Sequence, residues 1–575
     1  MCKDEVSIEP EPEFTRVSRS GRRFRAALTR SVLASRWLES FATPCHYQGT
    51  AIQLCNETGD SDLPALPPVH PRRLRFRGNP MNSVSRLSVV RQVVKQLQGA
   101  SNALRLPALR NGLRALSETD AIELRKALLG AIGILDDSIS NPYIGSIFDR
   151  TANGPLNEML ASIADAYGVK ESFASTTGTT GLNAPGVMAL AGEGDTIIVG
   201  RDCHVSVVGG LCLSGATPVY LIPHFDPESG VLLPPTVEEV TSLLDAHPRA
   251  RAIVLTMPTY HGLMGDVVAI VRECHQRGVL VMVDEAHGPH FHFLRGLGFP
   301  IAAEDAGADL VTQSTHKVLS ALSQGSLLHC NNTSLTRRYE EAQSFGFQST
   351  SFSLPILVSL EHAIEQMLMN GEPMWAHAVE CARRLRRGAA QLPGVHVLDE
   401  RIIDSKRVAG MDPTRVTLNV RRTGRTGYMV GEGLLRRGFI VEMSTSDVVL
   451  FLVSPSVSYG QIDALLAALK DVVKDAPARV PSHAYEPPPL PQQVLTPRQA
   501  AMQKARKRVP KAEAIGRVCA ETIGCFPPGQ AIFVAGEQIT GDGVRYLERA
   551  ISAGGHLKRI QDDEFQTIEV VDASN

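Results

Sequence analysis

The chain has 575 residues, of which 43% are hydrophobic and 21% charged, and its formal net charge is −2. A prior of roughly one domain per 100 to 200 residues predicts about three to four domains. This charge gives no reason to expect a nucleic acid or a membrane surface as partner, and no apolar run approaches the ~20 residues that span a bilayer. The ten cysteines are scattered without a CxxC pair, so we expect a cytoplasmic protein with reduced thiols and a small-molecule partner.

The N-terminal part shows no lasting periodicity. Residues 1–83 mix charge, proline and isolated apolar residues, which predicts a partly disordered extension. Seven arginines between Arg16 and Arg36 resemble an organelle transit segment, but five acids precede them within residues 1–14, and we prefer a solvated basic helix or tail. Residues 84–150 carry apolar residues at helical spacing and predict a helical lead-in.

Residues 151–389 alternate apolar strands with amphipathic helices. Continuous Val/Ile/Leu strands are buried on both faces, so we predict a large α/β domain with a mostly parallel sheet and a ligand site at the carboxyl ends of its strands. The expected strands are 196–199, 217–221, 252–256, 279–283 and 310–313, and the expected helices include 156–167, 237–247 and 267–278.

Three further segments follow. Residues 390–475 predict a small α/β domain, with strands at 415–420 and 448–453 and a closing helix at 461–474. Residues 476–493 contain many prolines and predict a semi-rigid linker. Residues 494–575 predict a last compact α+β domain.

A lysine and an aspartate stand at the ends of two predicted neighbouring strands. Asp284 follows the strand 279–283, and Lys317 follows the strand 310–313 within Ser314-Thr315-His316-Lys317. A lysine amine can form a Schiff base with the aldehyde of pyridoxal 5'-phosphate, and a carboxylate can hold its pyridine nitrogen protonated. At ~4 Å and an effective dielectric of ~20 this attraction amounts to ~4 kcal/mol. The pair therefore predicts a pyridoxal phosphate enzyme.

A glycine- and threonine-rich loop precedes a helix of small residues. The stretch from Ser175 to Asn183 offers hydroxyls, and its glycines free backbone amides at the start of the helix, which together suit a phosphate. Alone such a run is usually an ordinary loop. Combined with Asp284 and Lys317 it predicts the phosphate site of the cofactor.

Two other interpretations of the segment after Asp284 are less consistent with the sequence. Asp284-Glu285-Ala286-His287 spells the DEAH box of helicases, but no Gly-Lys pair of a phosphate-binding loop occurs in the chain. His287, His290 and His292 lie close in sequence, as metal ligands do, but Gly288-Pro289 breaks any helix that could align them. We therefore predict no metal site.

The motifs together resemble one family. The chain is similar to the Orn/Lys/Arg decarboxylases, fold type I pyridoxal phosphate enzymes that act on basic amino acids, from about residue 145 to 575. The resemblance rests on the segments 177–180, 201–206, 258–262, 284–288, 313–317 and 349–351, and on Pro497-Arg498, Ala514-Ile515-Gly516, Ala520-Glu521 and Phe526-Pro527-Pro528-Gly529 near the C-terminus.

The resemblance implies roles for individual residues. Lys317 would bind the cofactor aldehyde, Asp284 would pair with the ring nitrogen, and His204 would stack on the ring. His316 and His287 are candidates for proton handling that the sequence does not separate. Family sites are completed across a homodimer, so Ser349 or Thr350 would reach the phosphate of a neighbouring subunit. The full set of expected cofactor-binding residues is Gly178, Thr179, Thr180, His204, Asp284, Ala286, Ser314, Lys317, Ser349 and Thr350.

The expected function is decarboxylation of arginine, lysine or ornithine to the amine and CO2, in polyamine biosynthesis. The sequence lacks the His-x-Pro-Gly-His-Lys segment of the family, and Ser351-Phe352-Ser353 stands where the family usually has Ser-Pro-Ser. Both departures concern the substrate side. Two alternatives therefore stay open: another pyridoxal phosphate reaction (aldol cleavage, transamination or oxidative deamination), and a non-catalytic regulatory homologue.

Overall fold

The computed structural model describes residues 102–103, 155–349, 352–404, 406–474, 487–526, 531–558, 562 and 564–572. These residues all belong to one compact unit. The expected extension 1–83 and nearly all of the expected lead-in 84–150 lie outside them. Within that lead-in, the described strand β1 (Asn102–Ala103) pairs in parallel with β15 (Phe439–Ile440).

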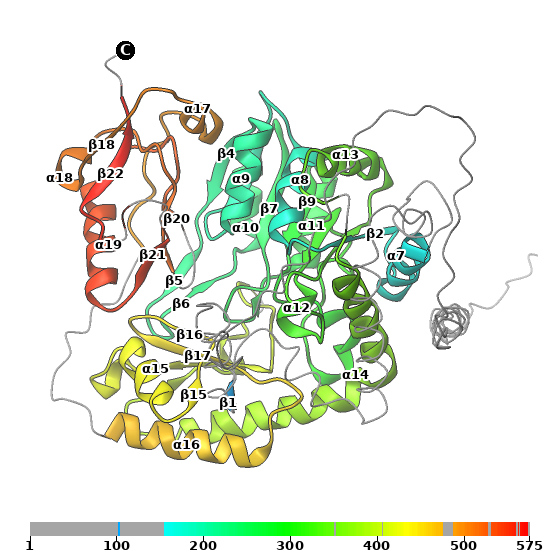
Figure 1. Ribbon diagram of the computed structural model, residues 1–575, viewed down its shortest axis with the longest axis vertical. Coiled ribbons are helices and arrows are strands. Elements are labelled where there is room, and N and C mark those ends of the chain that lie inside the picture. Colours follow the sequence, from blue (N-terminus) through cyan, green and yellow to red (C-terminus); the bar gives the residue numbers. More distant parts are fainter. Residues whose placement is uncertain are drawn as a thin grey trace, which may run out of the picture. The chain divides into compact units, whose positions relative to one another are not determined.

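The largest sheet has seven strands in the order β2-β11-β10-β9-β7-β3-β4 (Figure 1). All neighbours in the run from β10 to β4 are parallel, and β11 is antiparallel to both of its neighbours. The predicted mostly parallel sheet is confirmed, and the sequence analysis missed β2 and β11. The strands are β2 (Glu171–Ser175), β3 (Thr196–Gly200), β4 (Thr217–Leu221), β7 (Ala250–Thr256), β9 (Leu280–Asp284), β10 (Leu310–Gln313) and β11 (Ser326–Cys330).

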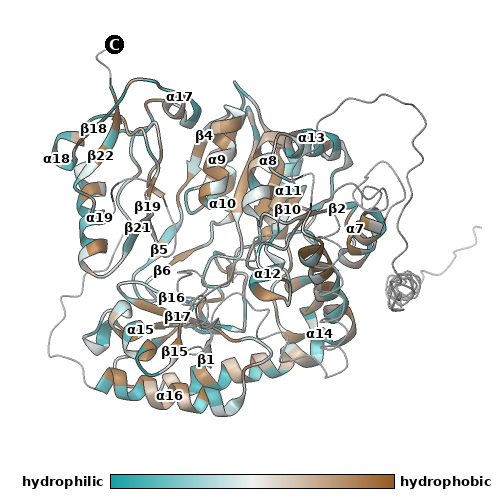
Figure 2. Ribbon diagram, viewed as in Figure 1, coloured by the Kyte–Doolittle hydropathy of each residue, from teal (hydrophilic) through white to brown (hydrophobic). Residues whose placement is uncertain are grey.

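Helices cover both faces of this sheet. Successive side chains of each strand point to opposite faces, and the apolar ones on both faces are buried under helices. Ile197 and Val199 pack into the core under α8 (Thr180–Leu190), α9 (Val205–Ser214) and α13 (Thr333–Ser344), whereas Ile198 packs into the core under α10 (Val237–Ala246) and α11 (Val267–Gln276). Helices α8 and α9 are apolar over much of their surface (Figure 2) and are largely buried. Burial on both faces holds the strand ends rigidly, which matters for the residues that follow them.

A long helix, α14 (Leu354–Ala389), leads into a smaller antiparallel sheet in the order β12-β14-β17-β16. Leu385 and Ala389 of α14 pack in one core with Val416 and Phe451 of this sheet. The predicted domain boundary near residue 390 remains a prediction. The elements are β12 (His396–Val397), β14 (Arg415–Asn419), α15 (Gly427–Leu435), β16 (Met443–Ser444), β17 (Val448–Leu452) and α16 (Tyr459–Lys474).

The C-terminal segment forms an α+β unit with its own core, which includes Phe533, Leu547 and Ile568. Its strands are β18 (Arg506–Pro510), β19 (Ile523–Phe526), β20 (Ala531–Phe533), β21 (His556–Lys558) and β22 (Thr567–Val571), and its helices include α17 (Pro497–Ala501) and α19 (Gly541–Ser552). Among the described helices, none combines the length and apolarity that a membrane span requires.

A buried ion pair ties this C-terminal unit to the large sheet. Arg201, directly after β3, donates to both carboxylate oxygens of Glu537 at 2.6 and 2.8 Å and to the carbonyl of Ile532 at 3.0 Å. Glu537 also accepts the backbone N–H of Val534 at 2.8 Å. Two parallel N–H···O bonds of this kind fix direction as well as distance, so the C-terminal unit is held in a defined place beside the end of β3.

Candidate active site

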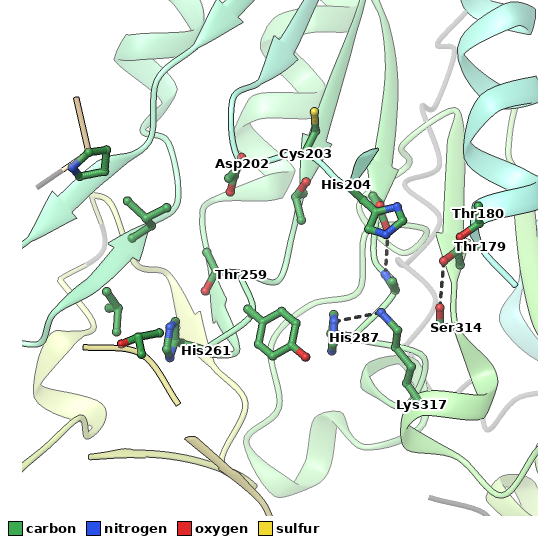
Figure 3. A pocket seen from close by; sticks show the side chains of 18 of the residues that line it. Thr179, Thr180, Asp202, Cys203, His204, Thr259, His261, His287, Ser314 and Lys317 are labelled. Carbon is green, nitrogen blue, oxygen red and sulfur yellow. Dashed lines mark hydrogen bonds between the residues drawn. The ribbon is translucent and has the colours of Figure 1, made fainter. Parts of the chain in front are cut away.

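The carboxyl ends of the parallel strands open onto a cavity of about 490 Å³. Of the ten predicted cofactor-binding residues, eight line it: Gly178, Thr179, Thr180, His204, Asp284, Ala286, Ser314 and Lys317. Figure 3 labels Thr179, Thr180, His204, Ser314 and Lys317 among them. His316 and His287, the two candidates for proton handling, line it as well. The structure therefore brings together residues that are up to 139 positions apart in the sequence, from 178 to 317.

Two predicted residues stand apart from this group. Ser349 is exposed and does not line the cavity, and Thr350 lies outside the described residues. The segment before them nevertheless approaches the glycine-threonine loop, because Thr177 Oγ1 donates to the carbonyl of Phe347 at 3.2 Å. Contact between Ser349 or Thr350 and a neighbouring subunit stays a prediction.

The glycine-threonine loop forms the start of α8. Gly178 has φ +75°, a left-handed conformation that a residue with a Cβ rarely adopts. This turn allows Thr179 and Thr180 to begin the helix, where backbone N–H groups lack intrahelical partners. Thr179 Oγ1 lies 3.0 Å from Ser314 Oγ (Figure 3). Hydroxyls from two chain segments thus meet at a helix N-terminus, which is a favourable place for an anion.

Asp284 is held by donors aimed at its carboxylate. Asn183 Nδ2 donates to Oδ2 at 2.8 Å, and the backbone N–H of Ala286 donates to Oδ1 at 3.2 Å. Asn183 is itself fixed, since its Oδ1 accepts from Thr312 Oγ1 at 2.7 Å. The sequence analysis did not assign a role to Asn183, although this polar residue lies within a helix of small residues. Its effect is to orient Asp284 as an acceptor at the end of β9.

The most informative contact in the cavity joins Lys317 and His287. Lys317 Nζ lies 3.1 Å from His287 Nε2 (Figure 3). On the other side of the ring, Arg415 Nη2 lies 2.9 Å from His287 Nδ1. Arginine can only donate, so Nδ1 accepts and the proton of the neutral ring must be on Nε2. Nε2–H then donates to Lys317, and Nζ can accept only as a neutral amine.

Burial favours the same protonation states. It lowers the pKa of Lys317, and the nearby charge of Arg415 acts in the same direction, while Asp284 and Glu442 oppose it. The pKa of His287 is also lowered, first by burial and then by Lys317 and Arg415. Both changes favour a neutral imidazole beside an uncharged lysine, the nucleophilic form of that side chain.

Arg415 was missed by the sequence analysis. It is fully buried, and besides His287 it donates to the carbonyl of Tyr260 at 2.6 Å and to Asp412 at 3.3 Å. In the sequence, Arg415 stands at the start of a predicted strand and has no evident partner. Its contacts become visible only where β14 packs beside Tyr260 and His287. A buried arginine with three partners fixes the ring of His287.

His316 has the opposite tautomer. Its Nδ1 lies 2.9 Å from the carbonyl of Gly325, which can only accept, so Nδ1 carries the proton and Nε2 keeps a lone pair. Burial lowers its pKa. The structure therefore separates the two histidines: His287 presents N–H to Lys317, and His316 presents an acceptor.

His204 begins α9 at the rim of the cavity. Its Nδ1 accepts the backbone N–H of Ser206 at 3.2 Å and lies 2.8 Å from Ser206 Oγ. These contacts fix the imidazole while the side chain stays exposed. A fixed, exposed, flat ring at the cavity wall is suited to stacking on a planar ligand.

The histidines after Asp284 do not converge on one point. His287 faces Lys317, whereas His290 Nε2 lies 3.2 Å from Asp412 and His292 Nδ1 lies 2.9 Å from Asp305. Within the described residues, ligand atoms of His292, Glu304 and Asp305 do lie within 4.8 Å of one another. Arg295 also pairs with Asp305, so a cation already neutralises that carboxylate.

The sequence matches a known protein family over most of its length. Residues 132–461 match the family described as Orn/Lys/Arg decarboxylase, major domain, and residues 478–557 match its C-terminal domain. The chain is 32% identical over 446 residues to an arginine decarboxylase of Halalkalibacterium halodurans, covering 76% of this chain and 88% of the relative. It is 32% identical over 413 residues to an arginine decarboxylase of Bacillus subtilis, covering 71% and 84%.

The fold agrees with that result. The crystal structure of the lysine decarboxylase LdcF of Francisella novicida aligns with a TM-score of 0.64 and 21% identity, over 84% of this chain and 83% of that one. The architecture is thus that of the fold type I enzymes, as the sequence predicts. The chain belongs to the Orn/Lys/Arg decarboxylase family, and it is a decarboxylase.

Proposed function

We propose that this protein catalyses the pyridoxal phosphate-dependent decarboxylation of a basic L-amino acid, arginine, lysine or ornithine, to the corresponding amine and CO2. The observation that carries the proposal is the contact of Lys317 Nζ with His287 Nε2 at 3.1 Å in the same cavity as Asp284. The names of the relatives, arginine and lysine decarboxylases, support the substrate class.

The residues of the cavity fit the cofactor group by group. Thr179, Thr180 and Ser314 offer hydroxyls for a phosphate, and His204 offers a flat ring for stacking. Asp284 offers a carboxylate, held by Asn183, for a protonated ring nitrogen. When bound, pyridoxal phosphate would accept the electron pair released as the carboxylate of the substrate leaves as CO2.

The protein residues divide the remaining work. Lys317 supplies an uncharged amine, because it accepts a hydrogen bond from His287 and burial lowers its pKa. His287 holds a proton at Nε2 beside the reacting nitrogen, and Arg415 keeps it there by occupying Nδ1. His316 offers its Nε2 lone pair as a proton acceptor. We propose His287 as the donor and His316 as the acceptor in proton handling.

The same proposal covers the pathway, the cellular compartment, the oligomeric state and the domain division. An amine product fits polyamine biosynthesis. The free thiols of Cys203, Cys212, Cys274, Cys330, Cys381 and Cys519 fit a reducing compartment such as the cytoplasm. We further propose a homodimer in which Ser349 or Thr350 reaches the partner's phosphate site, and a domain division at residues 151–389, 390–475 and 494–575.

The test is an amino-acid panel with product identification. Purified protein loaded with pyridoxal phosphate is given arginine, lysine, ornithine and several neutral amino acids, and CO2 and amines are quantified. We expect CO2 and a single amine in equal amounts from one or more basic amino acids. An aldehyde or a keto acid in place of the amine would favour another reaction at the α-carbon.

A second measurement tests the role of Lys317. The loaded protein should show a visible absorption band that borohydride abolishes, and Lys317→Ala should lack that covalent adduct and lose at least about a thousandfold in activity. Retention of the borohydride-sensitive band in Lys317→Ala would refute the assignment of this lysine.

A further inference from the structure

The charges that line the cavity do not balance. Among the described residues that line it, the acidic ones are Asp202, Asp284 and Asp447, and Lys317 is the one lysine or arginine. Three of its histidines add little positive charge, since burial lowers the pKa of His261 to about 3 and also lowers that of His287 and His316. If Asp284 and Lys317 serve the cofactor, as in the proposed function on which this inference rests, two carboxylates remain for a cationic ligand.

Asp447 lies in the turn between β16 and β17, on the small-domain side of the cavity. Its residue is 6% exposed, and its backbone is fixed because its carbonyl accepts from the N–H of Val420 at 2.8 Å. Across from it, a Cβ placed on Gly230 would lie 3.4 Å from the Cβ of Asp447, so the hairpin of β5 (His224–Asp226) and β6 (Val231–Leu233) closes over this turn. The carboxylate therefore has a defined position.

No ion pair within 4.0 Å involves Asp447 in the described part of the chain. Its carboxylate accepts from the hydroxyl of Ser446, and Arg421 acts on it only through longer-range attraction. Burial raises its pKa, which is the behaviour of an acid whose charge is incompletely compensated. A cationic ligand would supply the missing compensation.

Strand β14 runs between the surroundings of His287 and those of Asp447. Arg415, Thr417 and Asn419 alternate onto one face of this strand and contact His287, His261 and the carbonyl of Glu228, respectively. At ~3.3 Å per residue, Arg415 and Asn419 are about 13 Å apart. Asn419 pairs with Val448, the neighbour of Asp447. Lys317 and Asp447 thus belong to opposite ends of the cavity, as the two ends of a long amino acid require.

We propose that Asp447 binds the terminal ammonium or guanidinium group of the substrate side chain and so selects a basic amino acid. Asp202 is less suited to this role. It follows β3 two residues before His204, beside Cys203 (Figure 3), and its carboxylate is close enough to Asp284 for the two charges to repel. Asp202 therefore lies at the cofactor end, and Asp447 at the far end.

The experiment compares cationic and neutral ligands on the loaded full-length enzyme. Wild type, Asp447→Asn, Asp447→Glu and Asp202→Asn are assayed for kcat and KM with the basic amino acid that is turned over. Binding of its neutral isostere, citrulline for arginine or 6-hydroxynorleucine for lysine, is followed by the shift of the visible cofactor band. Asp463→Asn serves as a matched control, because Asp463 pairs with Arg384 on an exposed face of α16 and does not line the cavity.

We expect Asp447→Asn to raise KM for the basic amino acid about 10- to 100-fold, the range of one hydrogen bond to a charged group, with a smaller change in kcat. Affinity for the neutral isostere should not fall, and Asp447→Glu should keep the preference for the cation. A retained cofactor band in each variant shows that the site is folded.

Two outcomes would overturn the assignment of Asp447. One is an unchanged ratio of cationic to neutral affinity in Asp447→Asn, and the other is loss of that ratio in Asp202→Asn alone. Neither is confused with failure of the proposed function, in which the wild type would release no CO2 from any basic amino acid. In that case the band shift still measures whether Asp447 distinguishes cationic from neutral ligands.

Discussion

The two ends of the cavity are built differently. At the cofactor end, Asp284, Ser314 and Lys317 follow strands of one sheet that is buried on both faces, and each has a hydrogen-bond partner within 3.2 Å. At the far end, the wall combines Asp447, Pro487 of the predicted linker, Tyr546 of α19 and the hairpin β5–β6. One sheet supplies the first end, and several separate segments supply the second.

This difference teaches how chemistry and selectivity can be separated in one protein. Rigid strand ends fix the reacting groups to within fractions of an ångström, as proton and electron transfer require. The far wall depends on how the units pack together, so it can change with little effect on the cofactor. Variants should therefore affect kcat and cofactor binding at one end, and KM or stability at the other.

After Lys317→Ala, the largest effect should come from Asp284→Asn. This change removes the charge that would face the ring nitrogen and keeps the size of the side chain. An attraction of about 4 kcal/mol corresponds to roughly a thousandfold loss of kcat/KM. Steady-state kinetics and cofactor content would measure it. Activity within tenfold of the wild type would contradict the role of Asp284.

The second prediction concerns the pair that fixes the far wall. Glu537→Gln leaves Arg201 buried without its ion pair, so we expect a loss of about 3 kcal/mol or more in unfolding free energy and a higher KM. Denaturant unfolding would measure the loss. Glu341→Gln breaks an exposed pair with Arg337 and should cost less than about 1 kcal/mol. Equal losses in the two variants would show that the Arg201–Glu537 pair does not hold the C-terminal unit.

A smaller effect is expected for Asn183→Ala. Asp284 Oδ2 and the hydroxyl of Thr312 both lose their partner, and one such hydrogen bond is worth about 1 kcal/mol. We predict roughly tenfold weaker cofactor binding with KM for the amino acid nearly unchanged, measured by titration of the apoenzyme. A change confined to KM would mean that Asn183 serves the substrate end.

Near neutral pH, the smallest effect is the pH dependence contributed by His261. The pKa of His261 is lowered to about 3 from 6.5 by burial, so unfolded chains bind its proton more readily between these values. Above pH 6.5, His261 is neutral in both states and does not reduce the free energy of unfolding. As pH falls from 6.5 toward 3, the free energy of unfolding decreases by about 1.4 kcal/mol per pH unit, because only the unfolded chain binds the proton. His261→Gln should reduce this slope in unfolding free energies measured between pH 7 and 4. An unchanged slope would contradict the prediction.

Sequence patterns anticipated the large sheet well because its central strands are nearly continuous apolar runs. The predicted segments at 196–199, 217–221 and 310–313 all lie within observed strands. Strands β2 and β11 were missed, since Glu171–Ser175 and Ser326–Cys330 carry serine, glutamate and histidine among their apolar residues. Polar residues weaken the apolar signal on which strand prediction relies.

The sequence predicted only those residues of the site that lie next to predictable strands and helices. Gly178, Asp284, Ser314 and Lys317 lie directly after or before predictable elements, so their place at one edge of the sheet follows from topology. Arg415 comes from β14, and Asp447 comes from the turn between β16 and β17, both outside the large sheet. No local pattern reports that a side chain on β14 will reach His287, because that contact depends on domain packing.

The sequence by itself thus determined the family, the cofactor-binding motifs and the strand ends that carry them, because these are local patterns of residue type and spacing. The tertiary structure decided which nitrogen of His287 and of His316 carries the proton, which residue orients Asp284, and which carboxylates line the cavity with Lys317. Those properties depend on donors and acceptors brought together from distant segments, and only the folded chain sets their distances.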